Sequence, residues 1–135
     1  MAHRIQVISI YRPRIDQGST VQKPELLRAM SHATSIVEGV VDLVITELRY
    51  HIVEYLLSGR AIKINGLGTW TPNLSLDGTL EVQYRADAML IKALKESRKF
   101  HGRISNRENV GLSGDELVAK WNELHPEDTA VFSER

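Results

Sequence analysis

Residues 60–70 decide the fold, and they read Arg60-Ala61-Ile62-Lys63-Ile64-Asn65-Gly66-Leu67-Gly68-Thr69-Trp70. The first half predicts a short strand, because isoleucines alternate with other residues. Gly66 and Gly68 then allow a tight bend with backbone angles that other residues adopt only at a cost. A dinucleotide-binding loop is excluded, since a third glycine is missing and a strand, not a helix, follows.

A second and a third strand are predicted over Thr69–Ser75 and Thr79–Arg85. A two-residue turn at Asp77-Gly78 would set Leu80 opposite Ser75, which mixes apolar and polar residues on one face. A three-residue loop, with Gly78 in a left-handed bulge, makes one face wholly apolar. Because the buried face fixes the register, we expect the pairs Leu74–Leu80, Pro72–Val82 and Trp70–Tyr84.

Two helices are predicted before this sheet. The first begins near Pro24 and ends near His32, since proline suits a first helical turn. The second spans about Ile36 to Ser58, with Ser35 and Glu38 as a capping box and Gly59 as its stop. This helix is too apolar to be covered by one chain, which predicts a C2 homodimer. The predicted interface residues are Val37, Val41, Val44, Leu48 and Tyr55.

Three further elements complete the expected fold. The β-branched run Arg4–Tyr11 predicts an N-terminal strand. Asp87–Lys99 predicts a third helix, with Met89, Leu90 and Leu94 inward and lysines and arginines outward. Near the C-terminus, Ser113 and Glu116 form a capping box that opens a short helix with Leu117, Trp121 and Leu124 on one face.

Charge is unevenly distributed along a chain of zero net charge. Residues 59–107 carry nine basic and four acidic side chains, a net charge of +5. Residues 108–135 carry two basic and seven acidic side chains, a net charge of −5. A cationic segment is the electrostatic pattern of a phosphate-binding protein, although a solvated surface gives the same composition.

The order of elements, with the Gly66-Leu67-Gly68-Thr69-Trp70 bend, resembles the bacterial histone-like HU and integration host factor family over about residues 22–99. Trp70 stands where that family usually has phenylalanine. The resemblance implies an α+β HU-like fold, with a helical dimerisation core and a small antiparallel sheet. We expect an HU-like domain over residues 1–107, including the N-terminal strand, and a C-terminal extension over residues 108–135. Extra segments of this kind are similar to those of extended HU-related proteins.

The resemblance implies a sequence-nonspecific DNA-binding protein of the bacterial nucleoid. HU proteins reach the minor groove with a long basic arm whose tip carries a proline wedge. Here the loop at Asp77-Gly78 leaves no room for an arm, and Pro72 lies within a strand. DNA contact is therefore expected through phosphates, with strong salt dependence. The candidate residues are Arg60, Lys63, Arg85, Lys92, Lys95, Arg98, Lys99 and Arg103.

Other functions are compatible with the same residues. A dimerisation or scaffold module without DNA contact is the main alternative, favoured by the missing arm and the acidic C-terminal segment. Leu117, Trp121 and Leu124 would then contact a protein partner, unless they pack on their own domain. Glu47, His51 and Glu54 share a helix face at metal-ligand spacing, but a solvated charged stripe is the simpler interpretation.

The sequence predicts neither an enzyme nor a cofactor or metal requirement, because no nucleophile elbow, phosphate loop or paired-carboxylate motif is present. It contains no cysteine and no apolar run of membrane-spanning length. A cytoplasmic location is the resulting expectation.

Overall fold

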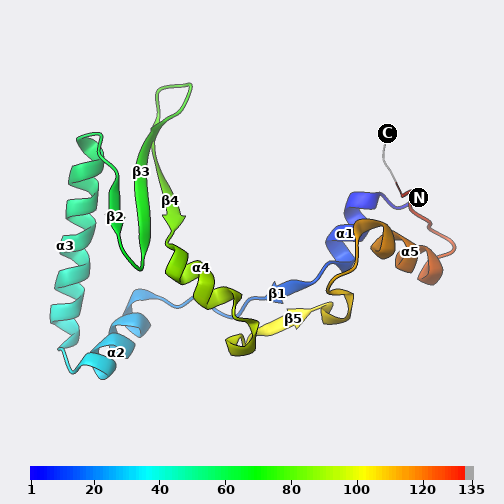
Figure 1. The fold of residues 1–135 in the computed structure, drawn as a ribbon, viewed down its shortest axis with the longest axis horizontal. Helices are drawn as coiled ribbons and strands as arrows, with labels where there is room; N and C mark the ends of the chain where they lie inside the picture. Colours follow the sequence, from blue (N-terminus) through cyan, green and yellow to red (C-terminus); the bar gives the residue numbers. More distant parts are fainter. Residues whose placement is uncertain (133–135) are drawn as a thin grey trace. The chain divides into compact units, whose positions relative to one another are not determined.

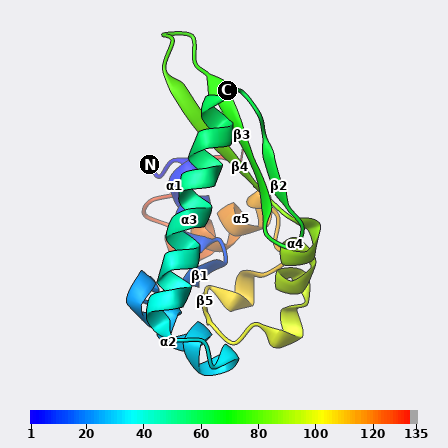
Figure 2. The same cartoon turned by 90° about the vertical axis from the view of Figure 1, so that its left-hand side faces the viewer.

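The computed structural model describes residues 1–132 and divides the chain into two compact units (Figures 1 and 2). The central unit is Ser19–Phe100, and the terminal unit combines Met1–Gly18 with His101–Arg135. The last three residues of the expected C-terminal extension, 133–135, lie outside the described residues. The N-terminal segment, expected within the HU-like domain, is thus grouped with the C-terminal extension.

The central unit begins with two helices, as predicted. Helix α2 (Lys23–Thr34) has Pro24 in its first turn, and helix α3 (Glu38–Leu57) packs against it. Gly59 has φ +80°, and the amides of Gly59 and Arg60 donate to the carbonyls of Leu56 and Tyr55. This pair of bonds is the Schellman ending that a left-handed glycine allows, and it confirms Gly59 as the helix stop.

The capping box predicted at Ser35 is wrong. Ser35 has φ 61° and ends α2, with its amide donating to the Ser31 carbonyl at 2.8 Å. The residue that precedes α3 is Val37, which makes no side-chain cap. A residue in the left-handed conformation cannot also serve as the extended N-cap of the next helix, so the Ser35–Glu38 spacing is coincidental.

The three-stranded sheet has the order β2-β3-β4, formed by β2 (Ile62–Ile64), β3 (Gly68–Leu74) and β4 (Leu80–Ala86). Both pairings are antiparallel, and the predicted register is confirmed, because Trp70 pairs with Tyr84, Pro72 with Val82 and Leu74 with Leu80. Gly78 has φ +86°, as the three-residue loop requires. Helix α3 lies along the sheet and contacts β2 and β3 (Figure 1).

Gly68 begins β3 at a point where no side chain fits. Its φ is +154°, and a Cβ there would lie 2.5 Å from the Arg85 carbonyl oxygen and 2.6 Å from the Tyr84 ring. The ring of Tyr84 packs against Trp70 with 5.2 Å between centroids, and its hydroxyl donates to the Leu67 carbonyl at 2.8 Å. The absence of a side chain at Gly68 therefore leaves room for the Trp70–Tyr84 pair.

Helix α4 is shorter than predicted. It spans Ala88–Lys95, and Ser97–Lys99 follows as the 3₁₀ turn η1. Asp87 caps the helix by accepting from the Met89 amide at 2.9 Å, whereas Glu96, with ψ 80°, leaves the helical conformation. The residues predicted to face inward, Met89, Leu90 and Leu94, are exposed within one chain.

The strand predicted over Arg4–Tyr11 is wrong, because those residues form helix α1. Helix α1 packs against α5 (Gly114–Leu124), and Val7 and Val118 are fully buried with Ala130 in a small core. A run of β-branched residues favours a strand only weakly, and the apolar surface of α5 decides the outcome. A strand does follow, since β1 (Arg14–Asp16) pairs antiparallel with β5 (Arg103–Ser105).

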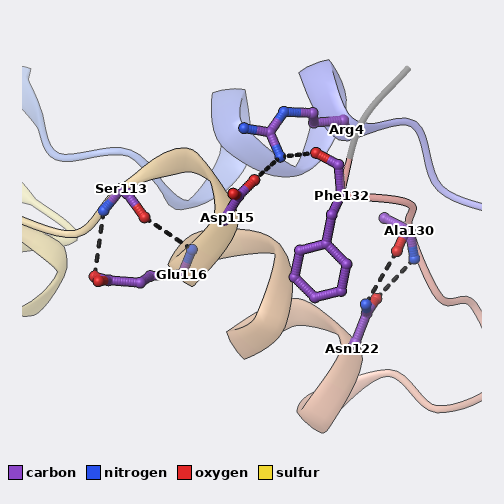
Figure 3. Close-up of polar contacts among 7 residues, drawn as sticks. All are labelled: Arg4, Ser113, Asp115, Glu116, Asn122, Ala130 and Phe132. Carbon is purple, nitrogen blue, oxygen red and sulfur yellow. Dashed lines mark hydrogen bonds and ion pairs between the residues drawn. The ribbon is translucent and has the colours of Figure 1, made fainter. Parts of the chain in front are cut away.

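Side chains and backbone tie the two halves of the terminal unit together (Figure 3). The predicted capping box is confirmed, because Ser113 accepts from the Glu116 amide at 3.2 Å and Glu116 accepts from the Ser113 amide at 3.3 Å. Arg4 forms an ion pair with Asp115 at 2.5 Å and donates to the Phe132 carbonyl. A short 3₁₀ turn, η2 (Arg107–Asn109), connects β5 to the segment that precedes α5.

Within residues 1–132, every helix is too short or too polar to cross a membrane.

Candidate nucleic-acid interface

The sheet of the central unit has one polar and one apolar face. Lys63 pairs with Thr69, and Thr69 pairs with Arg85, so a single row across the three strands carries two cations. Neighbouring strands lie about 4.8 Å apart, so Lys63 on β2 and Arg85 on β4 lie within one narrow band across the sheet. The next rows on this face pair Thr71 with Gln83 and Asn73 with Glu81. We call this face the polar strip.

The polar strip contains a shallow hollow of about 550 Å³, lined by Thr69, Thr71, Gln83, Tyr84 and Arg85. Hydroxyl, amide and guanidinium groups are donors that suit phosphate oxygens. Lys63 and Arg85 were predicted as DNA contacts, but Thr69, Thr71 and Gln83 were not. The predicted register could have identified them, since they occupy alternate positions to the apolar residues.

Arg60 lies apart from the polar strip. Its guanidinium carbon is 5.3 Å from the centroid of the Tyr55 ring, at the C-terminal end of α3. A cation at this distance is attracted by the aromatic face. The pair therefore places a predicted DNA contact beside a residue of the predicted dimer interface.

A second group of cations gathers at the end of α4. Lys92 and Lys95 lie in the last turn of the helix, and Arg98 and Lys99 lie in η1. All four are exposed, and Lys99 forms an ion pair with Glu96 at 3.1 Å. Cations are favoured at helix C-termini whether or not a ligand binds, so position alone does not assign a function to this group.

Arg103 is not brought together with the other candidates. It lies on β5 in the terminal unit, opposite Asp16, and its Nη1 is 3.9 Å from the Asp16 carboxylate. The sequence suggested one continuous basic segment up to Arg107. The pairing of β5 with β1 ends that continuity, because it assigns Arg103 to another compact unit.

The predicted dimer residues form a largely exposed surface on α3. Val37 and Val44 are 70% and 60% exposed in the single chain, and Leu48 and Tyr55 are also exposed. Val41 differs, since it is buried and its surface is already covered within one chain. Leu43 and Leu57 add to the exposed apolar area. Large exposed apolar side chains along one helix are typical of a surface that another molecule covers.

Most of the α5 face that was predicted to bind a protein partner packs within the terminal unit instead. Leu117 is buried, and Trp121 is partly buried. The indole of Trp121 stacks on His125 at 3.8 Å, lies 5.6 Å from the Tyr11 ring, and donates to the Asp128 carbonyl at 2.6 Å. Leu124 is exposed. These contacts match the interpretation that the helix packs on its own domain.

The histidine on α3 belongs to an exposed charged stripe. His51 lies 3.4 Å from Glu47 and 3.8 Å from Glu54, and all three side chains are largely exposed. Among the described residues, His, Asp and Glu side chains form no group that could hold a metal ion.

A protein-family model matches a large part of the chain. Residues 9–95, more than half of the chain, match the family HU-HIG, described as an HU domain fused to wHTH, Ig, or Glycine-rich motif. No individual curated protein matches the chain.

Proposed function

This chain belongs to the HU-HIG family of HU domains fused to other motifs, and from that membership we propose that it binds duplex DNA through the phosphate backbone. The observation that carries the proposal is the row Lys63–Thr69–Arg85, which sets two cations and a hydroxyl across one face of the sheet. Phosphate contacts hold a protein on DNA without reading its sequence. Binding with little sequence preference is therefore expected.

A homodimer is part of this proposal. The central unit buries only Leu27 and Val41 among its large apolar side chains within one chain. The exposed apolar residues of α3 and the apolar face of the hairpin need cover, and a second copy can provide it symmetrically. Two copies would also double the cations of the polar strip and of α4. Doubling matters because the salt-dependent affinity grows with the number of phosphates neutralised.

The proposed mode of binding does not include an inserted arm. Strands β3 and β4 end at the pair Leu74–Leu80, and the loop beyond them carries Asp77 and no cation. Minor-groove wedging needs an apolar side chain on a cationic arm, which reaches past the phosphates. We therefore propose contact along the duplex surface as a nucleoid-associated protein of the bacterial cytoplasm. No catalysis or cofactor is part of this function.

The proposal is tested by the salt dependence of binding to a random-sequence duplex, measured by fluorescence anisotropy. The wild-type chain should bind with a Kd of about 10⁻⁴–10⁻⁶ M near physiological salt, and more tightly at low salt. The double variant Lys63→Gln/Arg85→Gln should lower the slope of log K against log salt by about 0.9 for each phosphate that the protein no longer neutralises.

Glu25→Gln is the charge control, because Glu25 is an exposed acid on α2, outside the polar strip. It should leave the slope unchanged. A stable dimer that ignores DNA even at low salt would contradict the proposal and favour a scaffold module. Its support would be the zero net charge and the acidic loop at Asp77.

A further inference from the structure

The terminal unit carries four arginines on and beside the β1–β5 ribbon. The register pairs Arg14 with Ser105 and Asp16 with Arg103, so Arg14 and Arg103 share one face, and Ile15 and Ile104 share the other. Arg12 lies two residues before Arg14, and Arg107 lies two residues after Ser105. Asn106 holds this end together, since its Nδ2 donates to the carbonyls of Ile10 and Arg12 at 2.7 and 3.1 Å.

Among the described residues, the side chains of three of these arginines make no ion pair that would hold the unit together. Arg12, Arg14 and Arg107 are exposed, and within residues 1–132 their guanidinium groups form no ion pair. Arg103 has a single long contact with Asp16, at 3.9 Å. The other two cations of the described terminal unit behave differently. Arg4 pairs with Asp115 at 2.5 Å, and Lys120 donates to Asn109 at 2.5 Å.

Arg4 and Lys120, which make contacts within the unit, therefore form a different group from the ribbon arginines. The second group gathers on one short ribbon, where the nearby carboxylates are Asp16 and Glu108. The register sets Asp16 opposite Arg103 and Ser105 opposite Arg14, so Arg14 has no carboxylate directly across from it. A bound polyanion would neutralise this charge.

We propose that the β1–β5 ribbon is a second DNA-binding surface, which contacts phosphates through Arg12, Arg14 and Arg107. A duplex suits this surface better than an acidic protein. Its two strands lie about 4.8 Å apart, and a major groove about 12 Å wide admits a two-stranded ribbon. Arginine is also the side chain whose planar fork matches phosphate oxygens. This inference rests on the proposed function and extends it to both units.

The test compares two triple variants of the full chain on a random-sequence duplex over a salt series. Arg12→Gln/Arg14→Gln/Arg107→Gln removes the charge, and the corresponding three lysine substitutions keep it. The glutamine variant should lower the slope of log K against log salt by about 2 to 3 per protomer, from about 0.9 per phosphate. The lysine variant should keep a slope close to that of the wild type.

Trp121 reports whether the terminal unit stays folded, since its indole packs within that unit. Near-UV circular dichroism in a Trp70→Phe background should be the same for both triple variants and their parent. A glutamine variant that keeps the wild-type slope, while Lys63→Gln/Arg85→Gln lowers it, overturns this inference and leaves the proposed function standing. If instead the glutamine variant lowers the slope and Lys63→Gln/Arg85→Gln keeps it, the result supports DNA contact at the ribbon and contradicts DNA contact at the polar strip.

An acidic protein is the alternative occupant of the ribbon. Retention on immobilised polyglutamate that the glutamine variant loses, with DNA binding unchanged, would assign the ribbon to a protein partner and overturn the inference.

Discussion

The side chain of Asn109 donates a hydrogen bond to the backbone carbonyl of Tyr11 at 2.6 Å, across 98 positions of sequence. Asn109 is 2% exposed, and its Oδ1 accepts from Lys120 Nζ at 2.5 Å. One buried amide thus joins the end of α1, the turn η2 and helix α5. The terminal unit is formed by both ends of the chain, and this residue connects them.

Asn109→Ala should destabilise the terminal unit by about 1–3 kcal/mol, because it leaves the partly buried Tyr11 carbonyl without its donor. The change is measured by urea unfolding followed through Trp121 fluorescence in a Trp70→Phe background. The central unit, followed through Trp70 in a Trp121→Phe background, should unfold at the same urea concentration as its parent. Asn65→Ala, at an exposed position of the central unit, is the control for asparagine removal. An unchanged Trp121 transition would show that the Tyr11 contact is not stabilising.

The elements that the sequence predicted correctly are those whose signals are local. The β3–β4 register was predictable because one register alone makes a wholly apolar face, and the Gly59 stop because few other residues adopt its backbone angle. The Ser113–Glu116 capping box is likewise contained within four residues. Each of these features depends on neighbours along the chain.

Two of the wrong predictions depend on distant contacts, whereas the Ser35 capping box failed for a local reason, because Ser35 ends α2 in the left-handed conformation. Arg4–Tyr11 is helical because Val7 packs in the same core as Val118, and no local pattern in the run contains that information. For the same reason Arg103 could not be separated from the basic residues of α4, since its strand pairs with β1. The candidate cations were identified by type, but their division between two units follows from tertiary structure.

Gly68→Ala should disrupt the sheet. The new Cβ would overlap the Arg85 carbonyl and the Tyr84 ring, and the φ of +154° is itself strained for alanine. We expect stability to fall by at least about 2 kcal/mol, measured through Trp70 fluorescence during urea unfolding, since backbone strain and overpacking each cost about 1–3 kcal/mol. Gly18→Ala meets nothing within 4 Å and should be neutral. Equal stabilities of the two variants would contradict the close approach at Gly68.

Asp77 should remain ionised to unusually low pH. Hydrogen bonds to the carboxylate, first from Ser75 and then from Thr79, lower its pKa from 3.8 to about 2. Because the folded pKa is depressed, the contribution of this carboxylate to the hairpin is complete above about pH 4 and is lost as the pH falls toward 2. An NMR titration of the Asp77 side-chain carbon measures the value directly. Ser75→Ala should raise the pKa toward 3.8, and an unperturbed value in the wild type would show that the turn is open in solution.

Val44→Asp should dissociate the proposed dimer. Val44 lies in the N-terminal half of α3 and is 60% exposed in one chain, so a symmetric interface along this helix would bury the new carboxylate without a partner. Burying an unpaired charge is costly, and we expect the dimer Kd to rise at least about 100-fold, or about 2.7 kcal/mol. Sedimentation velocity over a concentration series measures the change. Glu47→Ala, at an exposed and charged position of α3, should leave the dimer intact. Identical sedimentation of Val44→Asp and the wild type would place any interface elsewhere. DNA affinity should fall together with dimerisation, because separate monomers neutralise half as many phosphates on one duplex.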